Sequence, residues 1–115
     1  MLFLEYPKCS TCQKAKKWLD EHQISYEDRH IVEKNPTFEE LKDWYGRSGL
    51  PLKKFFNTSG MLYKEMKLKD KLPEMSEEEQ LKLLATNGML VKRPLIVDGD
   101  RVLTGFKMAE WEALL

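Results

Sequence analysis

The chain has 115 residues, of which 42% are hydrophobic and 33% are charged. This length and composition are typical of one soluble domain, here residues 1–115, that buries a core of its own. Lysine and arginine together number 19, as do aspartate and glutamate, so no basic excess draws the protein directly onto nucleic acid or a membrane. Since the chain shows neither the roughly 20 apolar residues of a membrane span nor a secretory leader, we expect a cytoplasmic monomer.

The N-terminal part of the chain predicts a strand, a helix and a second strand. Leu2–Tyr6 is a nearly continuous apolar run, as in strands that helices cover on both faces. From about Ser10 to about His22 the apolar residues change to helical spacing. Residues 24–29 then alternate between apolar and polar, which predicts a second strand reached through a right-handed helical crossover.

Both cysteines, Cys9 and Cys12, fall where the first strand ends and the first helix begins. A thiolate at such a place is stabilised by the unpaired N–H groups of the helix and by the positive end of its dipole. Four lysines nearby add positive potential: Lys8, Lys14, Lys16 and Lys17. We therefore expect at least one cysteine pKa below the ordinary value of about 8.5.

Helical spacing assigns the two sulfur atoms different roles. Cys12 shares with Ala15 the helix face that packs against a sheet, whereas Cys9 precedes or opens the first turn. We interpret Cys9 as the exposed nucleophile and Cys12 as the resolving thiol that attacks the mixed intermediate. The backbone N–H groups of Ser10, Thr11 and Cys12 are expected to stabilise the negative charge at the site.

Two other interpretations of the cysteines stay open at this point. Both could be small apolar fillers of the core, because free cysteine is among the most buried residue types. A zinc site would need His22 and His30 as further ligands, and their spacing from Cys9 and Cys12 does not match the usual zinc motifs. A Cys-x-x-Cys pair in a reducing compartment favours redox chemistry over both.

Residues 36–90 show no strand-like alternation and contain several helix starts. Thr37 and Ser76 each precede a glutamate by three residues, which is the capping-box pattern that opens a helix. The first of these helices is expected to end near Gly49, and a short helical turn is expected after Pro51. The pattern predicts a helical block between two regions that contain strands.

Strand patterns return near the C-terminus. Pro94–Val97 and Arg101–Thr104 flank the turn Asp98–Asp100, which predicts an antiparallel hairpin. Gly105 is expected to open a last helix. The buried stripe of this helix is predicted from apolar residues at helical spacing: Met108, Trp111, Leu114 and Leu115.

A Cys-x-x-Cys pair at the head of the first helix, within the order β-α-β, helices, β-β-α, resembles the thioredoxin superfamily. The resemblance implies an α/β thioredoxin-like fold with a mixed four-stranded sheet and a helical insertion at about residues 36–90. That superfamily carries a cis proline beside its active cysteine, and the resemblance assigns this place to Pro94. Proline is equally allowed as an ordinary first residue of a strand.

Four segments together resemble the arsenate reductase and Spx family of thioredoxin-fold proteins. They are Tyr6–Cys12, Phe55–Gly60, Lys92–Pro94 and Thr104–Phe106. The resemblance covers essentially the whole chain and keeps the order of the motifs. It is nearest to the Spx-like and arsenate-reductase-like branch that lies between the two named groups.

The resemblance assigns residues one at a time. Cys9 matches the nucleophile that attacks arsenic in the reductases, and Arg93 matches the arginine that holds the oxyanion or steadies the thiolate. Asn57 and the Thr104–Phe106 turn stand where the reductases carry two further arginines. We therefore expect weaker capture of a tetrahedral oxyanion, because each charged hydrogen bond contributes roughly 1.5–3 kcal/mol.

Cys12 instead matches the Spx proteins, which implies an internal disulfide with Cys9. The candidate oxyanion site thus has five members: Ser10, Thr11, Asn57, Arg93 and Pro94.

The resemblance implies two alternative functions. The first is an arsenate-reductase-like thiol-disulfide oxidoreductase that acts on a small oxyanion or a disulfide. It would hold no bound cofactor and would be reduced by glutathione with glutaredoxin, or by thioredoxin, as its redox partner. The second is an Spx-like regulator whose disulfide state controls binding to the RNA polymerase α-subunit. Gly49 lies near the position that Spx proteins use to meet the polymerase, although glycine often ends a helix for local reasons.

Overall fold

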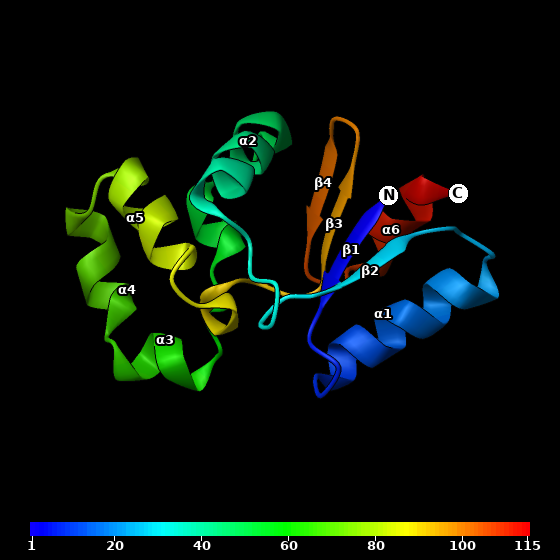
Figure 1. Cartoon of the computed structure of the whole chain (residues 1–115), viewed down its shortest axis with the longest axis horizontal. Helices are drawn as coiled ribbons and strands as arrows, with labels where there is room; N and C mark the ends of the chain where they lie inside the picture. Colours follow the sequence, from blue (N-terminus) through cyan, green and yellow to red (C-terminus); the bar gives the residue numbers. More distant parts are fainter.

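The computed structural model describes residues 1–115 and contains one mixed four-stranded sheet (Figure 1). Its strands are β1 (Leu2–Glu5), β2 (Glu27–His30), β3 (Leu95–Asp98) and β4 (Arg101–Thr104). They lie in the order β2-β1-β3-β4, and β1 runs parallel to β2 but antiparallel to β3. The pair of β3 and β4 is the predicted antiparallel hairpin. The expected α/β order, β-α-β followed by β-β-α, is therefore confirmed.

The helices cover both faces of this sheet (Figure 1). They are α1 (Ser10–Glu21), α2 (Phe38–Ser48), α3 (Met61–Glu65), α4 (Leu68–Lys71), α5 (Glu77–Leu84) and α6 (Met108–Trp111). α1 and α6 lie on one side of the sheet, and the helices α2 to α5, which come between β2 and β3, lie on the other. None of the helices has the length and apolar character that a membrane crossing requires.

Side chains from the two faces of the sheet form two separate hydrophobic clusters. Because successive strand residues point to opposite faces, Phe3 belongs to one cluster and Leu4 to the other. The smaller cluster joins the sheet to α1 and α6: Phe3, Ala15, Trp18, Leu19, Ile96 and Trp111. The larger cluster contains 17 buried residues and joins the sheet to the helices of the other side. α1 is thus held along its whole buried face, which also carries Cys12.

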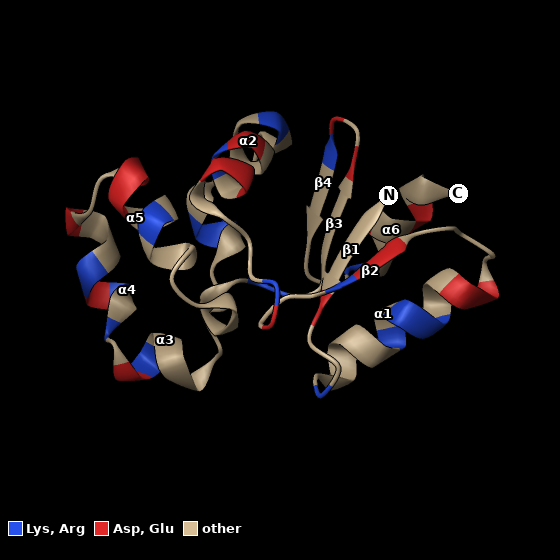
Figure 2. Ribbon diagram, viewed as in Figure 1, with Lys and Arg blue, Asp and Glu red and all other residues tan.

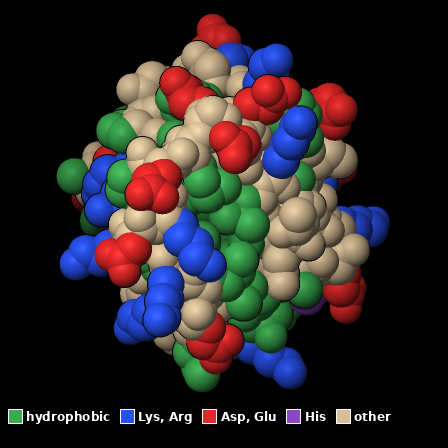
Figure 3. Space-filling model, turned by 90° about the vertical axis from the view of Figure 1, so that its left-hand side faces the viewer, with side chains coloured by type: hydrophobic (Ala, Val, Ile, Leu, Met, Phe, Trp, Pro, Cys, Tyr) green, Lys and Arg blue, Asp and Glu red, His purple; other side chains and the backbone are tan.

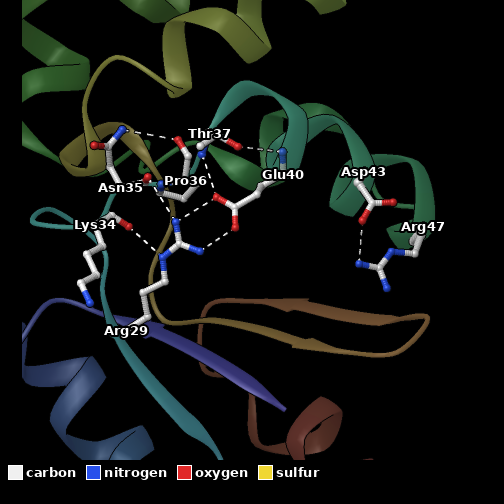
Figure 4. A network of polar contacts seen from close by, with 8 residues as sticks. All are labelled: Arg29, Lys34, Asn35, Pro36, Thr37, Glu40, Asp43 and Arg47. Carbon is white, nitrogen blue, oxygen red and sulfur yellow. Dashed lines mark hydrogen bonds and ion pairs between the residues drawn. The ribbon is translucent and has the colours of Figure 1, made fainter.

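A polar network fastens α2 to the end of β2 (Figure 4). The guanidinium of Arg29 donates to both oxygens of the Glu40 carboxylate, at 2.6 and 2.9 Å. It also donates to the carbonyls of Lys34 and Asn35, in the segment that connects the two elements. Hydrogen bonding from Arg29 holds the pKa of Glu40 below its usual range, so the pair is charged at neutral pH.

Both predicted capping boxes are present. The Thr37 hydroxyl accepts the Glu40 N–H at 3.1 Å, and the Glu40 carboxylate accepts the Thr37 N–H at 3.0 Å. Ser76 and Glu79 repeat the arrangement at the start of α5. Gly49 ends α2 in the left-handed conformation, with φ of 67°, as the pattern of a helix-ending glycine predicts.

The structure corrects the predicted ends of two elements. The second strand begins at Glu27, opposite Leu2 of β1, whereas the sequence pattern placed its start near residue 24. Gly105 does not open the last helix, because its φ of +77° is left-handed, and the helix begins only at Met108. Within the predicted buried stripe, Met108 and Leu115 are exposed, since this short helix buries only its Trp111 face.

Charged side chains of both signs are mixed over the helices, as the balanced composition predicts (Figure 2). On the side that carries α4 and α5, a band of apolar side chains lies between acidic and basic groups (Figure 3). No single sign of charge dominates the surface in that view.

Gly88 allows the chain after α5 to pass close to the segment after β2. A Cβ atom at this position would lie 1.9 Å from the carbonyl oxygen of Ile31, so Gly88→Ala must displace backbone. We predict that it lowers the free energy of unfolding by about 2 kcal/mol or more. Gly46→Ala is the matched control, because nothing lies within 4 Å of its Cβ position inside α2. For Gly46→Ala we expect the free energy of unfolding to rise by up to about 1 kcal/mol. Urea denaturation measures both changes. Equal effects at the two sites would contradict this account of Gly88.

Candidate active site

Cys9 is the N-cap residue of α1 and is half-buried. Its own N–H donates to the Tyr6 carbonyl at 2.9 Å, and its carbonyl accepts the Gln13 N–H at 3.1 Å. These two bonds fix the backbone at the point where β1 leads into the helix. The Cys9 sulfur therefore sits beside the N–H groups of the first helical turn, which have no carbonyl partner within the helix.

The surroundings of Cys9 favour its thiolate. Partial burial acts against ionisation, but hydrogen bonding from the N–H and the thiol of Cys12 acts the other way. A hydrogen bond and the positive charge of Arg93 add to this, and together they hold the pKa of Cys9 below its ordinary value. The expectation of a lowered cysteine pKa is thus confirmed for Cys9.

The lysines that the sequence suggested as the cause of this shift are not the groups that produce it. Lys16 forms an ion pair with Asp28 at 2.9 Å, and Lys17 lies 3.8 Å from Glu21. Both lie along the helix beyond its first turn, where acidic partners offset their charge. The stabilising cation is instead Arg93, which comes from the other end of the chain.

Cys12 lies in the opposite environment. Its side chain is only 1% exposed, and burial, together with the neighbouring Cys9, raises the pKa of its thiol to about 12. Of the two thiols, Cys9 is therefore the one that ionises more readily, whereas Cys12 stays protonated at neutral pH. The two sulfur atoms are not bonded to each other in this structure.

The Arg93 guanidinium has two hydrogen-bond donors without an acceptor. Its guanidinium lies over the Tyr6 ring, 5.2 Å from the ring centroid. The Nε and Nη1 atoms are buried and have no partner among the protein groups. Buried donors without acceptors are rare in folded proteins, and these two are suited to an anion entering beside Cys9. The peptide bond between Arg93 and Pro94 is cis, as the resemblance implied, and Pro94 itself is buried.

A cavity of about 430 Å³ opens in front of Cys9. It brings together four of the predicted site residues: Cys9, Thr11, Asn57 and Arg93. Ser10, Cys12 and Pro94 do not line it. We call this cavity the thiol pocket.

Sequence reasoning missed two cations of the thiol pocket. Lys92 and Lys107 both line it, and neither forms an ion pair with an acidic side chain. Lys92 directly precedes Arg93, and Lys107 directly follows the Thr104–Phe106 turn. Their closeness in sequence to Arg93 and to the Thr104–Phe106 turn could have indicated that they line the pocket. The pocket therefore offers three positive charges where one arginine was expected.

Asn57 lies at the wall of the pocket and is 8% exposed. Its N–H donates to the Leu90 carbonyl at 2.8 Å, and its side-chain oxygen accepts from the Ser59 hydroxyl at 3.4 Å. Gly60 packs against its amide group. Asn57 thus shapes the pocket and presents a neutral amide at the place of a second arginine.

The structure offers no ligand set for the zinc alternative. No three His, Cys, Asp or Glu side chains lie close enough together to hold a metal ion. His22 caps the far end of α1, where its ring contacts the Trp18 carbonyl at 2.8 Å, and His30 ends β2. The arrangement instead provides a thiolate, a second thiol beneath it and a cationic cavity.

The origin of the low Cys9 pKa can be tested by substitution. Arg93→Gln removes a hydrogen bond and a charge from the thiolate, so we expect alkylation of Cys9 by iodoacetamide at neutral pH to slow about tenfold. Lys14→Gln removes an exposed positive charge from α1 and should leave the rate unchanged. The measurement is the pH dependence of the alkylation rate. A larger effect of the lysine than of the arginine would reverse this assignment.

Comparison with known proteins identifies the family of the chain. The model of the ArsC family matches residues 4–114. The crystal structure of an ArsC family related protein from Bacteroides fragilis is 68% identical, with a TM-score of 0.96 over 99% of this chain and 96% of that one. A possible arsenate reductase from Streptococcus mutans UA159 is 43% identical, with a TM-score of 0.91 over 99% and 97% of the two chains.

Two curated relatives come from Bacillus subtilis (strain 168). The uncharacterized protein YusI is 59% identical over 97% of this chain and 95% of its own length. The regulatory protein MgsR is 33% identical over 96% of this chain and 86% of its own length. The chain is thus similar both to a protein described as a possible arsenate reductase and to one described as a regulatory protein. From the family match and these relatives, the chain belongs to the ArsC family.

Proposed function

We propose that this protein is a thiol-dependent oxidoreductase that reduces disulfides and small oxyanions in the manner of an arsenate reductase. One observation carries the proposal: the low-pKa Cys9 faces a cationic pocket while the protonated, buried Cys12 lies directly behind it. A thiolate with a resolving thiol is the arrangement that thiol-disulfide exchange requires.

With a disulfide substrate, the Cys9 thiolate attacks one sulfur and forms a mixed disulfide, while the other sulfur leaves as a thiolate. Cys12 then gives up its proton and attacks the Cys9 sulfur. This step releases the second half of the substrate as a thiol and leaves a disulfide between Cys9 and Cys12. The substrate gains two electrons, and the two cysteines lose them.

With arsenate, the Cys9 sulfur bonds to arsenic and a hydroxyl group leaves as water after protonation. The unpartnered donors of Arg93 would hold the anionic oxygens during this step. Attack by Cys12 on the Cys9 sulfur then breaks the sulfur–arsenic bond. The bonding pair stays on arsenic, which is released as arsenite, and again both cysteines end in one disulfide.

Either route requires an external reductant to restore the two thiols. Glutathione with glutaredoxin, or thioredoxin, supplies two electrons and two protons in the proposed cycle. The exposed position of Cys9 relative to Cys12 makes the Cys9 sulfur the atom that such a reductant can reach.

The proposed roles predict different behaviour for the two serine variants. Cys12→Ser should accumulate a mixed disulfide on Cys9 when it is treated with a model disulfide, because nothing resolves it. Cys9→Ser should remain unmodified, because the Cys12 thiol is buried and protonated at neutral pH. Intact-protein mass spectrometry distinguishes the two adducts. Comparable labelling of Cys12 in the folded Cys9→Ser variant would contradict the assignment of roles.

A second candidate is a redox-switched regulator that binds the RNA polymerase α-subunit. The observation that favours it is the 33% identity with the regulatory protein MgsR. Gly49 gives it little support, because the left-handed conformation at the end of α2 already accounts for glycine there.

Turnover and binding can be measured side by side to separate the two candidates. For the oxidoreductase we expect arsenite formation, or reduction of a model disulfide, that depends on Cys9 and on added glutaredoxin or thioredoxin. We expect no retention of the purified polymerase α-subunit on the immobilised protein in either redox state. Specific retention of the α-subunit without any turnover would instead support the regulator.

A further inference from the structure

A second cavity continues the thiol pocket away from Cys9. It has a volume of about 410 Å³, and we call it the lysine groove. Five of its lining residues belong to the segment that leads into α3: Pro51, Lys53, Lys54, Phe56 and Thr58. It shares three others with the thiol pocket: Lys92, Thr104 and Lys107. The shared residues place the two cavities side by side, and we call the pair of them the depression.

Backbone hydrogen bonds hold the two walls of this depression together. The Lys92 N–H donates to the Phe55 carbonyl at 2.8 Å, and Phe56 forms an isolated β-bridge with Val91. The turn that carries Lys53 and Lys54 is therefore fixed against the segment that carries Lys92. The backbone of Lys53 and Lys54 is thereby held beside the segment that leads to Arg93.

The charge of this depression departs from that of the whole chain. Its lining contains five cationic side chains and no acidic one: Lys53, Lys54, Lys92, Arg93 and Lys107. None of the five forms an ion pair with an acidic side chain of the protein. Because the sequence holds equal numbers of acidic and basic residues, this is a local concentration of positive charge that attracts an anionic partner.

We infer that the lysine groove binds the acidic flank of a disulfide-bearing polypeptide and thereby places the cysteine of that polypeptide at Cys9. The inference rests on the proposed thiol-disulfide exchange and specifies the class of substrate. A tetrahedral oxyanion would fill only the Arg93 end of the depression. A peptide with glutamate or aspartate next to its reactive cysteine would occupy both parts, with its sulfur in the thiol pocket and its carboxylates near Lys53 and Lys54.

A peptide fits this surface better than a single-stranded nucleic acid does. Nucleic-acid grooves combine positive charge with exposed aromatic rings on which the bases stack. The aromatic residue of the lysine groove, Phe56, is only 1% exposed and offers no such platform. The other aromatic residue of the depression, Phe106, lies in the thiol pocket, and its ring packs edge-on against Trp111. The lysine ammonium groups are on flexible side chains, so each can pair with a separate carboxylate of the peptide. The hydroxyl of Thr58 supplies a neutral hydrogen-bonding group beside them.

The test compares two short peptides that carry one central cysteine, linked by a disulfide to thionitrobenzoate. In one peptide glutamates flank the cysteine, and in the other glutamines replace them. Attack by Cys9 on the peptide sulfur forms a mixed disulfide and releases coloured thionitrobenzoate, so the rate is measured directly by stopped flow. We expect the glutamate peptide to react about tenfold faster at low ionic strength. The preference should shrink in about 1 M salt, where the Debye length falls to about 3 Å.

Paired variants connect this preference to the groove. In Lys53→Gln/Lys54→Gln, the ratio of the two rate constants should fall about threefold or more. Lys64→Gln/Lys71→Gln is the matched control, because it removes two exposed lysines that lie outside both cavities. Its ratio should equal that of the unchanged protein. Urea midpoints of both double variants establish that neither ratio reflects unfolding.

The outcomes separate this inference from the proposed function. If both peptides react rapidly and at equal rates, the thiol chemistry stands and the acidic-peptide groove is overturned. If neither peptide reacts faster with the protein than with free cysteine, the proposed function fails, and the inference fails with it. A third outcome is that a single-stranded oligonucleotide blocks the reaction while the glutamate peptide reacts no faster than the glutamine peptide. The groove then binds a nucleic acid, and the inference is likewise wrong.

Discussion

The pairing of β1, β3 and β4 brings Cys9, Arg93 and the Thr104–Phe106 turn together at one end of the sheet. In the antiparallel register Leu4 lies opposite Leu95, so the end of β1, which leads to Cys9, lies beside the start of β3, which follows Arg93. Leu95 pairs in turn with Thr104, so the end of β4 reaches the same edge. Segments from the two ends of the chain therefore meet around one sulfur atom. The low pKa of Cys9 depends in part on this meeting, because Arg93, which is distant in sequence, adds to the hydrogen bonds from Cys12 that lower it.

The helices on the other side of the sheet supply the outer wall of the site. They are fixed to the sheet by apolar packing and by the ion pair between Arg29 and Glu40, in which both side chains are largely shielded from water. The chain then returns to the sheet past Gly88, which passes close to the carbonyl of Ile31. These contacts fix the backbone of the segment that carries Asn57 and the neighbouring lysines. In the proposed scheme, the chemistry of Cys9 and the choice of its substrate therefore depend on different parts of the fold.

Much of this arrangement could be predicted from local sequence patterns. The first helix, both capping boxes and the terminal hairpin depend on residues close together in the chain, and each was predicted correctly. The burial of Cys12 followed from its helical spacing with Ala15. Lys92 and Lys107 were missed as pocket residues because their position depends on strand pairing across the sheet, which no local pattern describes. The exposure of Met108 and Leu115 was missed because the length of the last helix depends on the left-handed turn at Gly105.

The shielding of Cys12 also bears on how the protein withstands oxidative damage. Peroxide reacts with thiolates, so the first sulfur to be attacked is that of Cys9, which becomes a sulfenic acid. Left alone, such a group proceeds to sulfinic and sulfonic acids that ordinary thiols do not reverse. The Cys12 thiol lies next to Cys9 and is poorly accessible to oxidants because it is buried. Its condensation with the Cys9 sulfenic acid releases water and gives a disulfide that can be reduced. With the roles proposed for the two cysteines, the buried thiol would thus protect the protein against permanent inactivation.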